Sequence, residues 1–504
     1  MSQPGELIPR RFAGAWWAWL LVLVPTAALA LMRWNAGAGL TVEDYAQYLL
    51  HAKALIEGRP YGDTGYIWTK YAPFVSPRLM PPGVPLLLAA VFLVTGYSVT
   101  AAKCVMLLSL LTFALVAGRT VAEHDGREAG LLLTLMLGLA APIMAFSTTA
   151  NSDLPYCAVL WSVILLVDRP GAWSWRRTAA IAALGLFSIA VRTVGVVLVP
   201  AMLVVAISRR RELGWRGFVP PALWCAAGLV AVLATSESGG LSHAILRLLQ
   251  RGNLRVMGNL RSYELSAFET LLYPFPFGLA NDLWHAAALV LVVVGLATWI
   301  RPAANRLALS FGVVYLGALA MLPLASDRYL WPLAPLILLG LWRGLRICAG
   351  VLERRWSWWP HWAVPAAVAA IAVAGAIRLA VLPPPRSLAA LPNVQRLFAE
   401  VRADAARGPM RVAFYKPRVL TLETGVPAMS LFEAPPPVIV AELQRRCITH
   451  VVIGSPGTRL AAGRAFNLTV AWRAQLFTRV YTNEAFHLYR FEGGPCADPD
   501  IRTP

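Results

Sequence analysis

Two acidic residues lie close to the ends of apolar stretches that are candidate membrane spans. Asp44 follows the apolar run 13–32, in the segment VEDYAQYLLHAKALIEG, and Asp153 comes just before the apolar run 154–168, in STTANSDLP. A carboxylate can take the proton of a hydroxyl group as that group attacks a substrate. Asp44 and Asp153 are therefore candidate catalytic residues for chemistry on a lipid-borne substrate.

Both carboxylates also have a structural interpretation. Residues Thr41 to Asp44 read T-V-E-D, the pattern of a capping box at the start of a helix. Asp153 precedes Pro155 by two positions, as an N-cap residue does when proline occupies the first helical turn. The two interpretations are compatible with catalysis, because a capping carboxylate keeps free lone pairs. A helix over 42–57 would end at Gly58 and place Asp44 and Tyr48 on one face.

Three basic residues are candidate ligands for a phosphate group. Arg192 lies in VRTVGVV with apolar sequence on both sides, where an arginine normally has an anionic partner. Arg328 lies in ASDRYLWPLAP at the entrance to a span, and Lys70 lies in the segment after the first span. The alternatives are that Arg192 snorkels to the lipid head groups and that Arg328 forms a surface pair with Asp327.

A stripe of arginines follows further along the chain. Arg247, Arg251 and Arg255 are spaced by four residues, so a helix would place them on one face. Such a stripe fits contact with lipid or phosphate. Gly252 and Asn253 disfavour a helix there, and ordinary interfacial binding is the favoured interpretation.

The composition indicates a protein with many membrane spans. Of the 504 residues, 58% are hydrophobic and 14% are charged, whereas soluble domains have roughly a quarter of their residues charged. The net charge of +19 does not indicate nucleic-acid binding, because most Lys and Arg lie in short loops between apolar runs. Loops of that kind stay in the cytoplasm. The first apolar run lacks a cleavage site and is interpreted as a retained anchor.

The charges predict a topology for the bacterial inner membrane. The N-terminus is expected in the cytoplasm, together with the basic loops 119–127, 169–177, 209–216, 301–306 and 343–355. The eleven predicted spans are 13–32, 99–118, 130–146, 154–168, 178–190, 193–207, 219–235, 283–300, 307–324, 329–344 and 361–382. The segment 82–97 is predicted to be a juxtamembrane or re-entrant helix, and 178–207 could be one tilted span instead of two.

The tail is predicted to be a separate domain on the outer face. Its short β-rich runs alternate with a helical stretch over 438–446, which indicates a small α/β domain over 383–504 after an all-α membrane domain over 1–382. Cys447 and Cys496 fall in this domain, where an oxidising compartment permits a disulfide. No metal-binding motif is present, so no metal site or cofactor is predicted, although a divalent metal stays open.

The order of these segments resembles that of the GT-C superfamily, especially bacterial members similar to protein O-mannosyltransferases and lipid A aminoarabinose transferases. The segments that carry the resemblance are EDYAQYLLHAKALIEG, MPPGVPLLLA, NSDLP, AVRTVGV, DRYLWPLAPLILL and YTNEAFHLYRF. It implies a GT-C-like catalytic domain with Asp44 and Asp153 at acidic positions of the first and second outer loops. Leu79 and Met80 replace the Glu-Lys pair of aminoarabinose transferases, which argues against aminoarabinose as the donor sugar.

The resemblance and the residues together predict an inverting glycosyltransferase. It would move a sugar from a polyprenyl-phosphate donor to a lipid, glycan or protein acceptor on the outer face of the membrane. Asp44 would be the base, and Arg192 or Arg328 would stabilise the leaving phosphate. The alternatives are a transporter, although no internal repeat is visible, and a lipid-binding protein without transferase activity.

Overall fold

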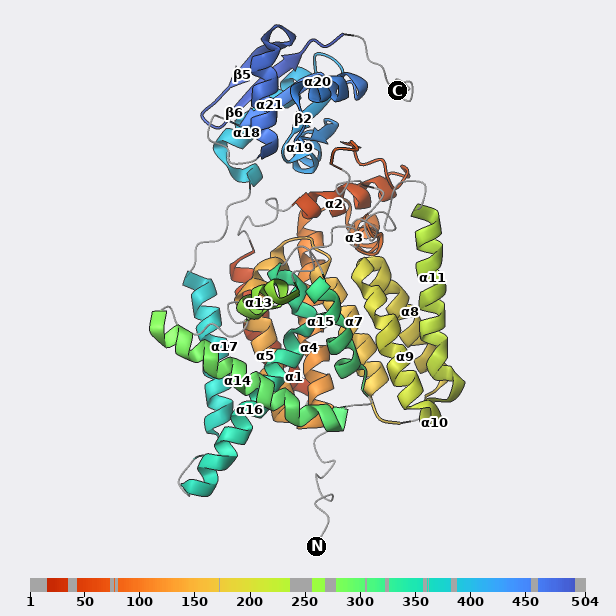
Figure 1. Ribbon diagram of the computed structural model, residues 1–504, viewed down its shortest axis with the longest axis vertical. Helices are drawn as coiled ribbons and strands as arrows, with labels where there is room; N and C mark the ends of the chain where they lie inside the picture. The colour runs from red at the N-terminus through yellow and green to blue at the C-terminus, as the bar shows by residue number, and fades with distance from the viewer. Residues whose placement is uncertain are drawn as a thin grey trace.

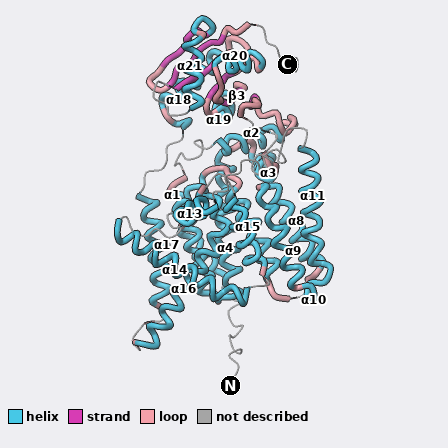
Figure 2. Tube along the Cα trace, viewed as in Figure 1, coloured by secondary structure: helices cyan, strands magenta, loops and turns pink. Residues whose placement is uncertain are grey.

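The computed structural model consists of a helical bundle with a small α/β domain at one end (Figure 1). It describes residues 16–34, 43–72, 77, 80–171, 173–235, 256–267, 278–303, 306–321, 326–356, 360, 362–381, 388–454 and 461–494. The strands gather in the end domain, and helices make up the rest (Figure 2). This is the predicted arrangement of a mostly helical body followed by a C-terminal sheet.

The described part of the bundle is built from helices that pack side by side. They are α1 (Trp16–Met32), α4 (Val99–Asp125), α5 (Arg127–Leu139), α6 (Ala141–Ala145), α7 (Asp153–Asp168), α8 (Trp175–Val191), α9 (Leu198–Ser208), α10 (Arg210–Leu213), α11 (Val219–Thr235), α14 (Gly278–Ala303), α15 (Leu307–Met321), α16 (Ala334–Arg355) and α17 (Ala363–Val381). Glycines allow α14 and α16 to pack closely, since a Cβ atom on Gly295 would collide with the carbonyl of Gly340. Close backbone approach through small residues is typical of helix pairs in membranes.

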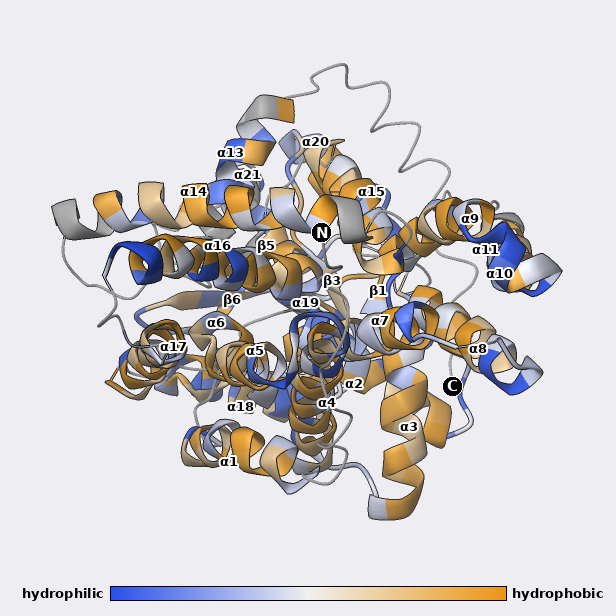
Figure 3. Cartoon of the chain, turned by 90° about the horizontal axis from the view of Figure 1, so that it is seen from below, coloured by the Kyte–Doolittle hydropathy of each residue, from blue (hydrophilic) through white to orange (hydrophobic). Residues whose placement is uncertain are grey.

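Four described helices are long and apolar enough to cross a membrane, or six if each of two bent pairs counts as one span. Large apolar side chains such as Leu93, Val230 and Val313 lie exposed on the outside of helices, and hydrophobic residues cover much of the bundle (Figure 3). An exposed apolar surface of this kind fits contact with lipid. The predicted total of eleven spans stays a prediction.

The chain over 178–207 forms two helices and not one long tilted helix. α8 ends at Val191, Arg192 is extended, and a 3-10 turn η5 (Thr193–Val197) leads into α9. The break therefore falls on Arg192, the arginine that the sequence singles out between two apolar runs.

Two helices lie between the bundle and the end domain. α2 (Glu43–Ile56) matches the helix predicted over 42–57, and Gly58 after it has a positive φ of 68°. α3 (Gly83–Thr95) packs against α2 and lies across the long axis of the molecule (Figures 1 and 3). α3 has the position expected of the predicted juxtamembrane helix. A further outer helix, α13 (Val256–Ala267), packs on α15.

The C-terminal domain is a six-stranded mixed sheet with helices on it. Its strands run in the order β1-β3-β2-β4-β6-β5. They are β2 (Val412–Phe414), β3 (Ala428–Ser430), β4 (His450–Gly454), β5 (Phe477–Thr482) and β6 (Phe486–Phe491), and its helices are α18 (Pro392–Ala405), α19 (Pro417–Thr424), α20 (Pro436–Arg445) and α21 (Ala461–Trp472). The β-rich runs predicted over 411–415, 450–454, 477–481 and 486–491 correspond to β2, β4, β5 and β6, and the helix predicted over 438–446 corresponds to α20. Cys447 is disulfide-bonded, and Cys496 lies outside the described residues.

The edge strand β1 (Tyr66–Ile67) comes from the loop after the first helix of the bundle, not from the tail. It pairs in parallel with β3, where Tyr66 aligns with Ala428. Gly65 permits this pairing, because its φ is 72° and a Cβ atom there would lie 2.6 Å from the Thr421 methyl group. The segment between α1 and α3 is thereby built into the C-terminal domain.

Candidate functional site

Asp44 lies in the first turn of a helix that is buried on nearly all sides. Tyr45 and Leu49 of α2 face the core of the bundle, whereas Ala46 belongs to the core of the C-terminal domain. The Asp44 Oδ2 atom accepts hydrogen bonds from both terminal nitrogens of Arg328, each at 3.3 Å. Its side chain remains 35% exposed. A carboxylate in this position is both oriented by cations and accessible to a substrate.

Asp153 is not the N-cap of its helix, contrary to the structural interpretation of the sequence. The Leu154 amide donates to the side-chain oxygen of Asn151 at 3.0 Å, and Asp153 is the first helical residue. Its carboxylate is only 3% exposed and forms an ion pair with Arg192. The buried charge is therefore used for pairing and not for capping.

Arg192 reaches Asp153 because the chain is extended at this residue, with φ −146° and ψ 131°. The break ends α8 and allows the side chain to turn toward the N-terminus of α7. Its guanidinium carbon also lies 5.4 Å from the centre of the Tyr329 ring. Arg192 thus pairs inside the protein, and the snorkelling interpretation is wrong.

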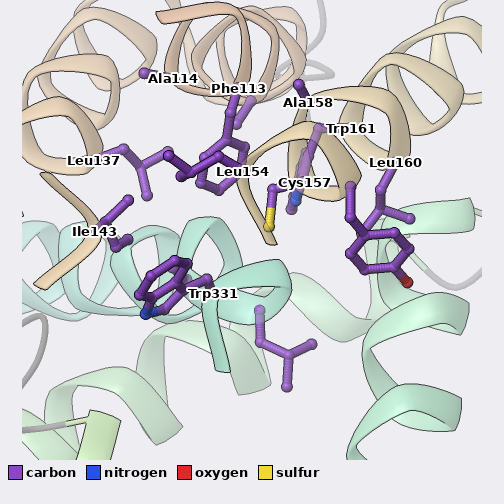
Figure 4. Close-up of a cluster of buried hydrophobic side chains, with 14 of the residues drawn as sticks. Phe113, Ala114, Leu137, Ile143, Leu154, Cys157, Ala158, Leu160, Trp161 and Trp331 are labelled. Atoms are coloured by element: carbon purple, nitrogen blue, oxygen red, sulfur yellow. The ribbon is translucent and has the colours of Figure 1, made fainter. Parts of the chain in front are cut away.

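Arg328 stands between the two carboxylates. It lies on a 3-10 helix, η9 (Asp327–Leu333), and its Nη1 atom is 3.9 Å from Asp153 Oδ2 as well as 3.3 Å from Asp44. The Trp161 indole donates to the Pro332 carbonyl at 3.0 Å, which fixes η9 against α7. Trp161 and Trp331 belong to a packed cluster of buried apolar side chains that also includes Phe113 and Leu154 (Figure 4). Arg328 thus lies between Asp44 and Asp153 with 24% of its side chain exposed, and the side chain of Asp327 lies outside the described residues, so the pairing of Arg328 with Asp327 stays a prediction.

A third arginine, Arg418, enters the cluster from the C-terminal domain. It lies in the first turn of α19, is 5% exposed, and its Nη1 atom is 3.5 Å from Asp44 Oδ1. Arg418 was not among the site residues predicted from the sequence. The only local pattern that could have indicated it is the KPRVL segment, in which an arginine stands between apolar residues.

Two further polar residues of α2, Tyr48 and His51, are buried in the same helix as Asp44. Burial raises the pKa of the Tyr48 hydroxyl, and the neighbouring charge of Asp44 raises it further, so Tyr48 stays protonated. Its hydroxyl hydrogen-bonds the side chain of Ser152, one residue before Asp153. Burial lowers the pKa of His51 to about 4, so the ring is neutral near pH 7. His51 Nδ1 donates to the Tyr61 carbonyl at 2.7 Å, which makes it a structural residue.

An apolar pocket of about 470 Å³ lies against η9, the 3-10 helix that carries Arg328. It lies between α13, α14, α15, α16 and η9, and Leu330, two residues after Arg328, is part of its wall. A hydrogen bond between Glu264 and His285 is among its few polar features. The pocket could hold part of a hydrocarbon chain close to the arginines.

The other predicted ligands do not join the cluster in the described part of the chain. Lys70 is exposed, and its ammonium lies 5.2 Å from the centre of the Tyr71 ring. Arg247, Arg251 and Arg255 lie outside the described residues. Among described side chains, no three His, Cys, Asp or Glu residues come together as a metal site would require. Asp44 and Asp153 have guanidinium groups as their near neighbours.

Comparison with known proteins identifies the fold. No protein-family model and no curated protein matches the sequence. ArnT from Cupriavidus metallidurans, solved with undecaprenyl phosphate, has a similar structure: the TM-score is 0.60 at 15% identity, over 94% of this chain and 97% of that chain. The oligosaccharyltransferase of Archaeoglobus fulgidus, solved with a tethered acceptor peptide, gives 0.61 at 12% identity over 94% and 74% of the two chains.

A second structure from the same archaeon, AglB with an inhibitory peptide and dolichol-phosphate, gives a TM-score of 0.56 at 12% identity over 87% and 69% of the chains. ArnT and AglB are both members of the GT-C superfamily. At these identities the likeness establishes a shared fold, and the chemistry must be argued from the residues.

Proposed function

We propose that this chain, which has the GT-C fold, is an inverting glycosyltransferase that uses a polyprenyl-phosphate-linked sugar as its donor. The observation that carries the proposal is the cluster of Asp44, Asp153, Arg192 and Arg328, together with an apolar pocket whose wall includes η9, the element that carries Arg328. Carboxylates, cations for a phosphate and room for a lipid chain are the three features that such a reaction needs. ArnT and AglB were solved with undecaprenyl phosphate and dolichol-phosphate, which supports the assignment.

The residues account for each part of the reaction. The acceptor hydroxyl attacks the anomeric carbon while Asp44 takes its proton, and a new C–O bond forms. The bond from the anomeric carbon to the phosphate oxygen breaks on the opposite face, which inverts the configuration. Arg192 and Arg328 stabilise the charge on the departing polyprenyl phosphate. Asp153 lies beside both arginines, and it contributes to the reaction by holding their guanidinium groups in position.

A phosphate leaving group explains why one base suffices. Glycoside hydrolases use two carboxyl groups, because one of them must protonate the departing sugar oxygen. A polyprenyl phosphate leaves as a stable anion and needs cations instead of an acid. Asp153 is paired with Arg192 and 3.9 Å from Arg328, which suits the second role and not the first.

We expect the purified protein to bind undecaprenyl phosphate much more tightly than undecaprenol, which lacks the phosphate. The reason is that charge-assisted hydrogen bonds from two guanidiniums act on the phosphate alone, and each such bond contributes on the order of 1.5–3 kcal/mol. Native mass spectrometry in detergent can measure both affinities. Equal affinity for the two lipids would contradict the proposal.

We place the cluster and the C-terminal domain on the outer face of the bacterial inner membrane. The proposal depends on the basic inner loops and is supported by the disulfide at Cys447, since disulfides persist in oxidising compartments. Reporter fusions at Arg127 and Arg355 should be active in the cytoplasm, and one at Ala441 should be active outside. A cytoplasmic reporter signal at Ala441 would contradict this placement.

A further inference from the structure

The guanidinium that the C-terminal domain contributes has no part in the reaction described above. Arg418 contacts Asp44 Oδ1 at 3.5 Å, on the carboxylate oxygen that Arg328 does not bind. Its guanidinium carbon also lies 5.7 Å from the centre of the Tyr66 ring of β1. Asp44 is therefore held between an arginine of the bundle and an arginine of the C-terminal domain.

The backbone around Arg418 is firmly attached to the helix that carries Asp44. α19 packs against α2, and Val419 and Leu420 share a fully buried core with Ala46. Strand β1 of the same outer loop is paired with β3, which follows α19. Arg418 consequently keeps its position relative to Asp44 as long as the domain is folded.

Arg328 has more anionic partners than one guanidinium can satisfy once a donor binds. It lies 3.3 Å from Asp44 and 3.9 Å from Asp153. A phosphate held by Arg328 must compete with both carboxylates, and like charges at these distances repel each other. Asp153 retains Arg192 as a partner. Asp44 needs another cation, and Arg418 is already beside it.

We propose that Arg418 is a positioning residue that neutralises and holds Asp44 when the phosphate of the donor occupies Arg328. This inference rests on the proposed function. The three guanidiniums and two carboxylates of the cluster leave a net charge of one positive unit. That charge matches the single negative charge of a phosphodiester such as a polyprenyl monophosphate sugar. Without Arg418 the cluster is neutral before the donor arrives.

The test is the affinity for undecaprenyl phosphate, measured by native mass spectrometry on the full-length protein. Arg418→Met should weaken binding by roughly tenfold, the effect of losing one charge-assisted contact. Removing the Asp44 charge as well, in Arg418→Met/Asp44→Asn, should restore the affinity to within about threefold of wild type, because the competitor for Arg328 is then uncharged. Loss of domain packing alone would not be rescued by Asp44→Asn.

Two comparisons complete the experiment. Arg402→Met is the matched control, because Arg402 belongs to the same domain and donates to the Glu423 carbonyl of α19 at 3.0 Å; its affinity should equal that of wild type. Arg418→Lys keeps the positive charge and should bind within about threefold of wild type.

Wild-type affinity in Arg418→Met, or weak binding that persists in the double variant, would overturn the role of Arg418. If Arg418→Lys lost as much affinity for undecaprenyl phosphate as Arg418→Met, that result would also overturn the role of Arg418. Equal wild-type binding of undecaprenyl phosphate and undecaprenol would instead overturn the proposed function, so the two failures are distinguishable.

Discussion

Replacing Asp44 by Asn should lower the rate of sugar transfer by roughly 10²- to 10⁴-fold, the range for loss of a general base. Asn has nearly the same shape and still accepts a hydrogen bond from Arg328 or Arg418, but it cannot take a proton near neutral pH. The rate is measured as consumption of the glycosylated polyprenyl phosphate in membranes that contain the variant.

Asp63, which lies in the segment that follows α2, is a matched control for the loss of one negative charge near Asp44. Asp63 is 52% exposed and pairs only with Arg59 among the described residues, so Asp63→Asn should transfer sugar at the wild-type rate. Thermal unfolding of both variants shows whether they are folded. Normal transfer by Asp44→Asn would exclude Asp44 as the base, and Asp153 would be the next carboxylate to test.

Replacing Arg192 by Ala should weaken binding of undecaprenyl phosphate by at least roughly tenfold and also destabilise the bundle. The phosphate loses a cationic donor, and the buried carboxylate of Asp153 loses its ion-pair partner, which typically costs about 3–5 kcal/mol. Lipid affinity and the unfolding temperature are measured on the same preparation.

A double variant separates these two effects. In Arg192→Ala/Asp153→Asn the buried charge is gone, so the unfolding temperature should recover toward that of wild type. The lipid affinity should remain low, because the phosphate donor has not been replaced. Unchanged affinity in Arg192→Ala would show that this arginine has a structural role only.

The sequence predicts the parts of the site that lie at the ends of apolar runs. Long apolar stretches mark the helices, and a charge beside or inside such a stretch, as at Asp44, Asp153 and Arg192, is costly unless it is paired. That reasoning, applied also to Arg328 at the entrance to a span, identifies four members of the cluster before their contacts are known. It does not show that Asn151, and not Asp153, caps α7, because both residue types are good caps.

The contribution of the C-terminal domain was not predictable in the same way. Strand β1 has two residues and pairs with a strand more than 350 positions later, so no local pattern marks it. Arg418 is one of many arginines in a basic tail, and its importance arises only when α19 packs on α2. Contacts between distant segments of this kind depend on tertiary packing, which one sequence does not reveal.

The most direct test of the central claim is the lipid content of a strain that lacks this protein. We predict that a glycosylated polyprenyl phosphate accumulates in the deletion strain and falls when the wild-type protein is restored. Restoring Asp44→Asn should leave the accumulation unchanged, and mass spectrometry of extracted lipids measures all three states. Identical polyprenyl-phosphate lipids with and without the protein would contradict its assignment as a glycosyltransferase.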